Sequence, residues 1–388
     1  MTACITGWAH SRFGKLDGET IESLITRVAT DAIADAGLEP KDIDAIYLGT
    51  MNAGFVRQEF PASLVLQADP SLRFKPSTHV ENACATGSAA VHQGLKAIAA
   101  GSARIALVVG VEQMTTTPAA EIGRNLLKAS YVREEADIDG GFAGIFGKIA
   151  GLYFQRWGDQ SDALARIAAK NHKNGVDNPY AQIRKDFGYE FCREESEKNP
   201  RVAGPLKRTD CSLVSDGAAA LVLTDVETAL KMRKAVVFRA AEHVQDFLPT
   251  SRRDILKFEG CSVAWHRALA SAGIALSDLS FAEVHDCFTI AELIEYEAMG
   301  LAPEGQGARV IADGIVAKDG KLPINRSGGL KAKGHPIGAT GVSMHAITAM
   351  QLTGTAGDMQ IKNPRLGGIF NMGGAAVANY VSILERLR

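Results

Sequence analysis

Cys84 lies in a setting that suits a nucleophilic thiol. In HVENACATGSAAVHQGLKAIAA a short β-like run meets a helix rich in Ala, Gly and Ser, so Cys84 stands where that helix begins. Unpaired N–H groups and the helix dipole favour a thiolate there, and cysteine pKa values can fall from about 8.5 to roughly 3.5–7.5. A buried structural thiol is the common alternative for a cysteine considered alone. The pattern predicts a reactive Cys84 with a lowered pKa.

A glycine-rich turn, NRSGGLKAKGHPIGATG, places His335 immediately before a second helix of small residues. An imidazole beside a thiol activates it, either as a base or as the cation of an ion pair. A loop histidine with a purely structural role is the alternative. Gly329 and Gly334 have the spacing of a phosphate-binding loop, but His335 and Pro336 follow in place of Lys and Ser/Thr, which excludes a nucleotide hydrolase.

The segment EVHDCFT ends an apolar, strand-like stretch with His285, Asp286, Cys287 and Phe288. Polar groups at the ends of buried strands are where α/β sheets hold binding and catalytic side chains. Residues two apart on an extended chain point the same way, so His285 and Cys287 are expected to face one pocket. Phe288 is a candidate substrate-binding residue. Polar capping of a strand end is the alternative. As a metal site the pair lacks two ligands and no second cluster offers them, so no metal is predicted.

The composition is that of an ordinary globular protein. The 388 residues are 46% hydrophobic and 22% charged, with a net charge of -2, which allows two or three domain-sized units. Neither a basic arm nor a charge block points to a nucleic-acid partner. No signal-like start and no apolar run of about 18 residues occurs, so we expect a cytoplasmic protein without a membrane segment. The cysteines lack CxxC spacing, which fits neither a disulfide framework nor a zinc ribbon.

Three echoes in the same order indicate a duplicated chain. DAIADAGLEPKDIDAIYLGT from Asp31 reappears as RALASAGIALSDLSFAEVHD from Arg267, an offset of 236 (267 minus 31). Both patterns predict a helix, a glycine stop, a turn and a strand. The other two echoes are CATG from Cys84 against GATG from Gly338, and SDGAAALVLTD from Ser215 against MGGAAVANYVSIL from Met372.

Alternating Ala-rich helical stretches and short Val/Ile/Leu runs indicate an α/β fold with mostly buried strands. Halves repeated in order are expected to pack side by side, each with one helix N-terminus at a shared centre, so that His335 faces Cys84. No echo is found between about residues 115 and 210, where SDALARIAAKNHKNG predicts a helix with Ser161 as N-cap and Gly175 as its stop. The expected domains are a first half (1–114 plus 211–245), an inserted segment (115–210) and a second half (246–388).

At these residues the chain resembles the thiolase superfamily over essentially its whole length. The matching motifs are ENACATGSAA around Cys84, SDGAAALVL from Ser215, GGLKAKGHPIGATG around His335 and the terminal MGGAA. EVHDCF and NHKNGVDNPY resemble the sterol-carrier-protein type of thiolase in particular. The resemblance implies a five-layered αβαβα fold of two duplicated halves, with an inserted loop domain that covers coenzyme A. It also implies acyl-CoA substrates, no permanently bound cofactor, and a homodimer or homotetramer.

The resemblance also implies roles for single residues. Cys84 matches the acylated nucleophile of the family, and His335 matches the histidine that activates it. Cys287 matches the second acid/base of this subtype, while His285 takes the place of an asparagine that lines one oxyanion hole. Gly373, with the backbone N–H of Cys84, matches the second oxyanion hole.

One departure from the family pattern concerns a C-terminal CxG loop, in which many thiolases carry their acid/base cysteine. Here that loop is Asn371-Met372-Gly373, so the thiol is missing from its commonest position. By resemblance to the subtype, Cys287 is the expected replacement.

Together these features predict an acyltransferase of lipid or fatty acid metabolism with a Cys84 acyl-enzyme. It would cleave a 3-ketoacyl-CoA with CoA, or condense an acyl-CoA with acetyl-CoA. Two alternatives stay open. A decarboxylating ketoacyl synthase shares the Cys-led helix, but typically uses two histidines, or His and Asn, without a second thiol. A thiolase-like subunit would function only beside a partner protein.

Overall fold

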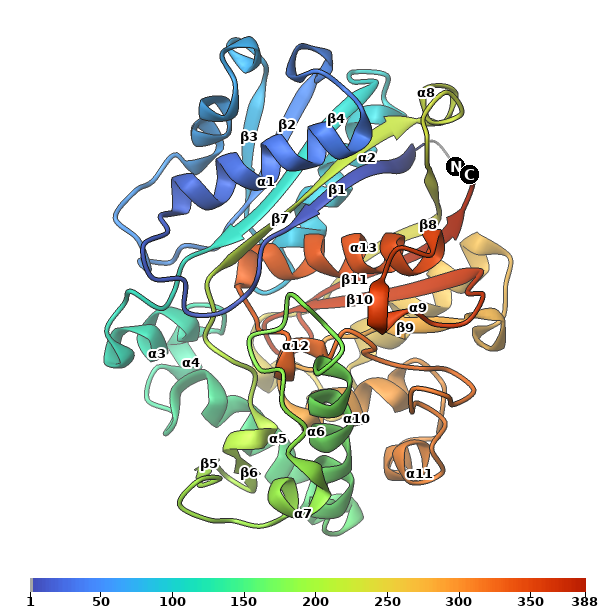
Figure 1. Ribbon diagram of the computed structural model, residues 1–388. Helices are drawn as coiled ribbons and strands as arrows, with labels where there is room; N and C mark the ends of the chain where they lie inside the picture. The colour runs from blue at the N-terminus through green and yellow to red at the C-terminus, as the bar shows by residue number, and fades with distance from the viewer. Residues whose placement is uncertain (1–2) are drawn as a thin grey trace.

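The computed structural model describes residues 3–388, in which the two halves of the chain build matching sets of elements (Figure 1). The first half forms β1 (Ala3–His10), α1 (Ile21–Ala36), β2 (Ala45–Gly49), β3 (Ser77–Val80), α2 (Thr86–Ala99), β4 (Ile105–Glu112), β7 (Gly217–Asp225) and α8 (Val226–Ala229). The second half forms β8 (Val236–Gln245), α9 (Glu259–Ala272), β9 (Phe281–Glu283), α10 (Thr289–Ala298), α11 (Gly307–Ala312), α12 (Gly329–Ala332), α13 (Ile337–Thr353), β10 (Leu366–Gly373) and β11 (Ala378–Arg386).

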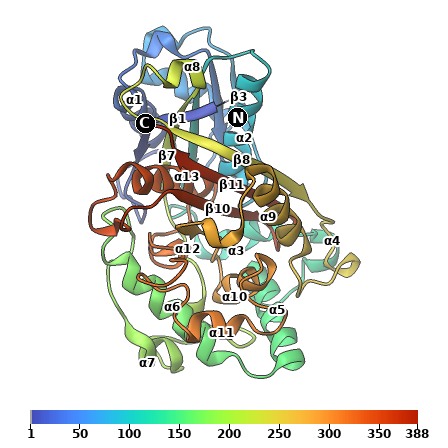
Figure 2. The same cartoon turned by 90° about the vertical axis from the view of Figure 1, so that its right-hand side faces the viewer.

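One nine-stranded mixed sheet runs through the described chain in the order β3-β2-β4-β7-β1-β8-β11-β10-β9. Its two halves meet only where β1 pairs with β8, at Cys4 with Val237 and Ile5 with Val236. Helix α1 packs on β2, β4 and β7, α2 and α13 lie together between the halves, and α9 and α10 cover the far side (Figures 1 and 2). The predicted α/β fold with five layers is confirmed. None of the helices within residues 3–388 combines the length and apolarity needed to cross a membrane.

The first sequence echo corresponds to equivalent elements at the same offset of 236 residues. Gly37 ends α1 and Gly273 ends α9, both in the left-handed conformation with φ values of 72° and 68°. A short 3-10 turn follows in each half, at Pro40–Asp42 and at Leu276–Asp278, and then β2 or β9. The glycine stops are therefore required by the backbone, because only glycine adopts this conformation at little cost.

The third echo pairs the correct strands, β7 and β11, but in the wrong register. Each half carries one β-bulge, at Thr6 of β1 opposite Leu223 and at Arg239 of β8 opposite Leu384. These bulges set the offset of β7 and β11 at 161 (384 minus 223), whereas the sequence match implied 157 (372 minus 215). The four-residue error arises because runs of Gly and Ala carry little register information of their own.

The inserted residues form α3 (Ala119–Leu127), α4 (Val132–Glu135), α5 (Gly141–Trp157), α6 (Ser161–Gly175), α7 (Gly188–Arg193), β5 (Arg201–Ala203) and β6 (Leu206–Lys207). They pack on the second half of the chain, since Phe146 and Leu164 share a buried cluster with Leu293 of α10. The helix predicted from Ser161 to Gly175 is confirmed, but its N-cap is wrong. Ser161 is already helical, and its N–H donates to the carboxylate of Asp159 over 2.8 Å. The domain boundaries stay a prediction.

Helices α2 and α13 cross backbone against backbone. A Cβ added to Gly87 would lie 2.7 Å from the backbone N of Val342 and 2.8 Å from that of Gly341. A Cβ on Gly341 would likewise collide with the backbone N of Ser88. These reciprocal contacts make Gly87 equivalent to Gly341, an offset of 254 (341 minus 87) that also relates Cys84 to Gly338. The second echo is therefore in the correct register.

We expect Gly87→Ala to destabilise the fold, because the added methyl group would collide with backbone atoms of α13, which cannot rotate away as a side chain can. The overpacking should lower the free energy of unfolding by about 1–3 kcal/mol, measured as a lower midpoint of urea denaturation. The matched control is Gly151→Ala in α5, where the added Cβ meets nothing within 4 Å. That change should be neutral or stabilise by up to about 1 kcal/mol. Equal effects of the two substitutions would contradict the crossing.

Candidate active site

Cys84 stands on a tight turn between β3 and α2. Ala83 adopts the left-handed conformation with φ 49°, and the N–H of Asn82 donates to the hydroxyl of Thr86 over 2.8 Å. The N–H of Ala85 donates to the carbonyl of Asn82 over 3.1 Å. The turn places Cys84 two residues before the first helical residue, as the sequence predicted, and leaves its side chain buried with 4% of the residue exposed.

His335 is held with one ring nitrogen free. Its backbone N–H donates to the Ser215 hydroxyl over 3.0 Å, and its Nδ1 lies 2.7 Å from the hydroxyl of Thr340. The Thr340 hydroxyl donates its own hydrogen to the carbonyl of Pro336 over 2.9 Å, so it can only accept from His335. The proton of His335 is therefore on Nδ1. Its Nε2 keeps a lone pair and has no hydrogen-bond partner in the described part of the chain.

His285 takes the opposite tautomer. The side-chain amide nitrogen of Asn371 lies 3.1 Å from the Cys84 carbonyl and 3.0 Å from Nδ1 of His285. A carbonyl oxygen only accepts, which identifies the amide end that faces both groups as the donor. His285 therefore accepts at Nδ1 and carries its proton on Nε2, which is buried without a partner among the residues that the structure describes.

The structure brings Cys84, His285 and His335 together from three separate loops. The sulfur and one nitrogen of each imidazole all lie within 4.8 Å of one another. The two rings meet edge to face with centroids 5.2 Å apart. Because Nδ1 of each ring is bonded to Thr340 or Asn371, the atoms left for the thiol are the bare Nε2 of His335 and the Nε2–H of His285. These groups suit nucleophilic attack and the stabilisation of an oxyanion.

Burial decides the charge state of this centre. It raises the pKa of Cys84 to about 12, and it lowers the pKa of His335 to about 3, with nearby Lys333 adding to the second effect. The lowered thiol pKa expected from the helix N-terminus is wrong, because the loss of hydration outweighs the helix dipole. The pair rests as a neutral thiol beside a neutral imidazole. Of the two roles that the sequence left open for His335, the geometry fits the base.

The same three side chains have the spacing of a metal site. A zinc ion would need a lone pair from each histidine together with a thiolate. His285 instead presents an N–H to the centre, because its Nδ1 accepts from Asn371. The donor set therefore does not suit a metal in this arrangement, and the absence of a metal stays a prediction.

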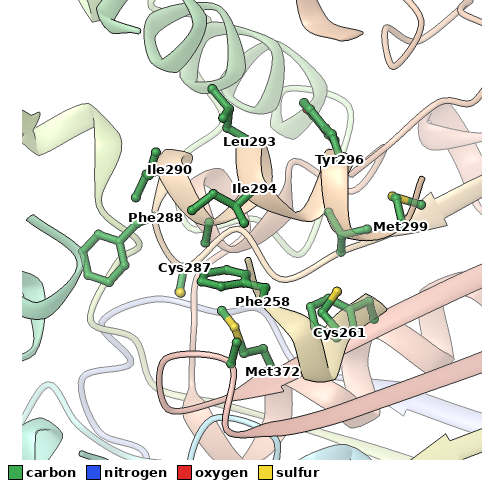
Figure 3. Packing of buried hydrophobic residues seen from close by; sticks show 14 of the residues in the cluster. Phe258, Cys261, Cys287, Phe288, Ile290, Leu293, Ile294, Tyr296, Met299 and Met372 are labelled. Atoms are coloured by element: carbon green, nitrogen blue, oxygen red, sulfur yellow. The ribbon is translucent and has the colours of Figure 1, made fainter. Parts of the chain in front are cut away.

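Cys287 lies next to this centre but outside the group of three. It is 2% exposed and packs in the cluster that contains Phe258 and Met372 (Figure 3). Burial raises its pKa well above the usual value, and the charge of a Cys84 thiolate would raise it further, so the two sulfurs are within electrostatic reach. The N–H of Asp286 donates back to the carbonyl of Val284 over 3.2 Å, so the extended chain assumed for residues 285–287 is not formed.

Two further predicted site residues have clear positions. Phe288 stacks on Phe146 of α5, with ring centroids 4.5 Å apart and planes inclined by 20°, so the inserted segment reaches the site. The backbone N–H groups that favour a Cys84 thiolate are those of Gly374 and of Cys84 itself, although burial outweighs them. Gly373, next to Gly374, has no room for a side chain, because a Cβ would lie 2.6 Å from the carbonyl oxygen of Asn82. Its role in the oxyanion hole stays a prediction.

Sequence reasoning missed several residues that position the site. Thr340 and Asn371 set the two tautomers, and Asn371 had been noticed only as a missing cysteine. Glu112 ends β4 and accepts from the N–H groups of Met51 and Gly338 at 2.9 and 3.0 Å, which caps the start of α13. An acidic residue directly after an apolar strand was the available signal for Glu112.

Comparison with known proteins gives a consistent result. The family model described as Thiolase, N-terminal domain, matches residues 3–227, and the model described as Thiolase C-terminal domain-like matches residues 241–386. An acetyl-CoA acetyltransferase of Methanothermobacter thermautotrophicus is 35% identical over 389 residues, 98% of this chain and 99% of that protein. Sterol carrier protein 2 of Oryctolagus cuniculus is 35% identical over 328 residues, 78% of this chain and 57% of that protein. The solved Ltp2-ChsH2(DUF35) aldolase, at 21% identity, has the same fold, with a TM-score of 0.81 over 100% of this chain and 98% of that one.

Alkylation of Cys84 by iodoacetamide should have no plateau near neutral pH. With a thiol pKa of about 12, the thiolate fraction is small and rises about tenfold per pH unit throughout the neutral range. The rate is followed by intact mass between about pH 6 and pH 9, with glutathione as the reference thiol. A rate that is already constant at about pH 6 would show a thiolate–imidazolium ion pair and contradict the neutral pair.

Thr340→Val should slow acylation of Cys84 by about 10- to 100-fold, because His335 loses the acceptor that keeps its proton on Nδ1. Thr340→Ser keeps the hydroxyl and should stay within a few-fold of the original rate. The measurement is the rate of acyl-adduct formation by quenched-flow mass spectrometry. If valine and serine behave alike, Thr340 does not set the tautomer.

Proposed function

The chain belongs to the thiolase family, and from this premise we propose that it transfers acyl groups to and from coenzyme A through a Cys84 thioester. The observation that supports this most directly is that the Cys84 sulfur and one ring nitrogen each of His335 and His285 lie within 4.8 Å of one another, with Nε2 unpaired on both rings. Acyl-CoA and CoA enter as substrates, and the chemistry requires no permanently bound cofactor.

In the first step the Cys84 sulfur attacks the carbonyl carbon while Nε2 of His335 takes the thiol proton. The negative charge moves to the carbonyl oxygen, where backbone N–H groups at Cys84 and Gly373 stabilise it together with Nε2–H of His285. Loss of one such donor commonly costs about 100- to 1000-fold in rate. The tetrahedral adduct then collapses and expels either the thiolate of CoA, which regains the proton from His335, or a carbon leaving group.

In thiolysis of a 3-ketoacyl-CoA the leaving group is the α-carbon of acetyl-CoA. We assign Cys287 as the acid that protonates this carbon as the carbon–carbon bond breaks, which leaves a Cys287 thiolate. Incoming CoA gives its thiol proton to Cys287, and its sulfur attacks the Cys84 thioester. The adduct expels the Cys84 thiolate, which takes back the proton held by His335. Condensation runs through the same steps in reverse, with Cys287 as the base.

The stacked rings of Phe288 and Phe146 support an apolar path for the acyl-pantetheine chain beside Cys84. Both rings belong to one buried cluster with Cys84 and Cys287. The acyl chains of lipid-metabolism substrates suit an apolar surface of this kind. The homo-oligomeric state and the cytoplasmic location stay predictions.

A second candidate function, a subunit that acts only beside a partner, is favoured by one observation. Asn371 occupies the place of the missing C-terminal cysteine, so Cys287 is the remaining candidate for the second acid/base group. The Ltp2-ChsH2(DUF35) aldolase, which shares the fold, is named for two components. A ketoacyl synthase would also use a cysteine with two histidines, and it would decarboxylate malonyl-CoA where a thiolase cleaves acetoacetyl-CoA.

The test incubates the purified chain alone with acetoacetyl-CoA and CoA, and with malonyl-CoA in parallel. We expect acetyl-CoA from the first mixture, no decarboxylation in the second, and an acyl adduct on Cys84 by intact mass. Cys287→Ala should keep the adduct but lose about 100- to 10,000-fold in turnover, because nothing remains to protonate the α-carbon.

Each other result contradicts a named part of the proposal. An adduct without turnover in the unmodified chain points to the partner-dependent subunit. Decarboxylation of malonyl-CoA points to the synthase. Near-normal turnover of Cys287→Ala would remove Cys287 from the mechanism, and an adduct on another cysteine would remove Cys84.

A further inference from the structure

A buried acid on α10 contacts the loop that carries His285 and Cys287. Glu295 has no exposed surface, and its Oε2 accepts from the backbone N–H of His285 over 3.1 Å. Its Oε1 is fully buried and has no hydrogen-bond partner among residues 3–388. The mechanism above makes no use of this group, although a buried polar atom is costly unless it is paired or has a task.

The groups around Glu295 give it no positive partner. Glu292 lies on the same helix, Asp286 and Cys287 on the adjoining loop, and Cys261 on α9. The nearby lysine, Lys170, pairs with Glu292 instead, and the two groups are 8% and 0% exposed. Burial, followed by the charges of Glu292 and Asp286, raises the pKa of Glu295 well above its usual value. Burial and these charges therefore favour the neutral form of the Glu295 carboxyl.

The contact with His285 also places the proton on Glu295. Because Oε2 accepts from the backbone N–H, the proton belongs on Oε1, the oxygen without a protein acceptor. The same carboxyl is within electrostatic reach of the Cys287 sulfur, on which a negative charge would act directly. A carboxylate at this point would oppose a Cys287 thiolate, whereas an O–H dipole would stabilise one.

We propose that Glu295 is a positioning residue that stays protonated, holds the His285–Cys287 loop and stabilises the negative charge that Cys287 acquires in the carbon–carbon step. This inference rests on the proposed function. When the Cys287 thiol gives its proton to the α-carbon, the sulfur keeps the electron pair, and CoA later restores the proton. Glu295 retains its own proton throughout and acts only as an uncharged dipole near Cys287, without a direct hydrogen bond to the sulfur.

Two substitutions separate this role from a structural one. Glu295→Gln keeps a neutral acceptor for the His285 N–H and a donor group, so it imitates the protonated acid. Glu295→Leu removes both. The matched control is Glu297→Gln on the same helix, since Glu297 faces away from the site and accepts from the N–H of Gly307 over 2.7 Å.

The readout is deuterium incorporation at C2 of acetyl-CoA in heavy water, which reports proton transfer at the α-carbon, with the Cys84 acyl adduct measured by mass in parallel. We expect Glu295→Leu to slow the exchange by about 10- to 100-fold and to slow adduct formation by a smaller factor, because the His285 backbone N–H that loses its acceptor belongs to a residue that also serves the first step. Glu295→Gln and Glu297→Gln should exchange near the original rate at neutral pH.

The pH profile gives the decisive signature. The raised pKa of Glu295 moves its ionisation to higher pH, and the ionised form would place a charge near Cys287, so exchange by the unmodified chain should fall as the pH rises through that ionisation. Glu295→Gln cannot ionise and should lose this decline, whereas Glu297→Gln should keep it. An alkaline decline that persists in Glu295→Gln overturns the proposal, as does unchanged exchange in Glu295→Leu.

An infrared measurement keeps the test independent of turnover and of the folding of Glu295→Leu. The difference spectrum between the unmodified chain and Glu295→Gln at neutral pH should contain the C=O band of a protonated carboxylic acid. A carboxylate band in its place would overturn the inference. If the unmodified chain forms no acyl adduct and exchanges no C2 proton, the proposed function fails instead, and the infrared result still decides the protonation of Glu295.

Discussion

The crossing of α2 and α13 is the contact on which the rest of the structure depends. At Gly87 and Gly341 the two backbones meet with no side chain between them, so the helices approach more closely than any pair of ordinary residues would allow. Each reactive residue stands just before one of these helices, Cys84 before α2 and His335 before α13. The crossing therefore brings both to one centre. Because hydrogen bonds and proton transfers fail beyond about 3.5 Å, any separation of the helices would cost chemistry as well as stability.

Desolvation at this centre sets the form of the chemistry. Burial keeps the Cys84 thiol and both imidazoles neutral at rest, so charge appears only as the reaction proceeds. Fixed N–H groups that already point at the developing charge are most effective in such a dry site, because no water has to reorient. Thr340 and Asn371 decide which imidazole accepts and which donates. Asn371 stands where many thiolases have a cysteine, and its side-chain amide donates to both the Cys84 carbonyl and Nδ1 of His285.

Much of the fold could be predicted from the sequence, because its signals are local. Helices α1 and α9 end at Gly37 and Gly273, because glycine adopts the left-handed conformation that ends a helix. The turn and strand after each glycine repeat at the same offset of 236 residues. The small residues that follow Cys84 predict that a helix begins just after it. The same local signals failed where side chains compete for one cap, as at Ser161, whose N–H is bonded to Asp159 instead.

The sequence by itself determined the duplication, the α/β fold and the three segments that meet at the site, since each is specified by residues close together in the chain. Tertiary structure alone decided the register of β7 against β11, the direction of the Cys84 pKa and the tautomers of the two histidines. Register depends on a partner strand, and a pKa depends on what covers the group. The tautomer of His285 depends on Asn371, 86 residues away, which becomes its neighbour only when β9 and β10 pair side by side. A local pattern cannot report such a contact, because the contact is created by folding.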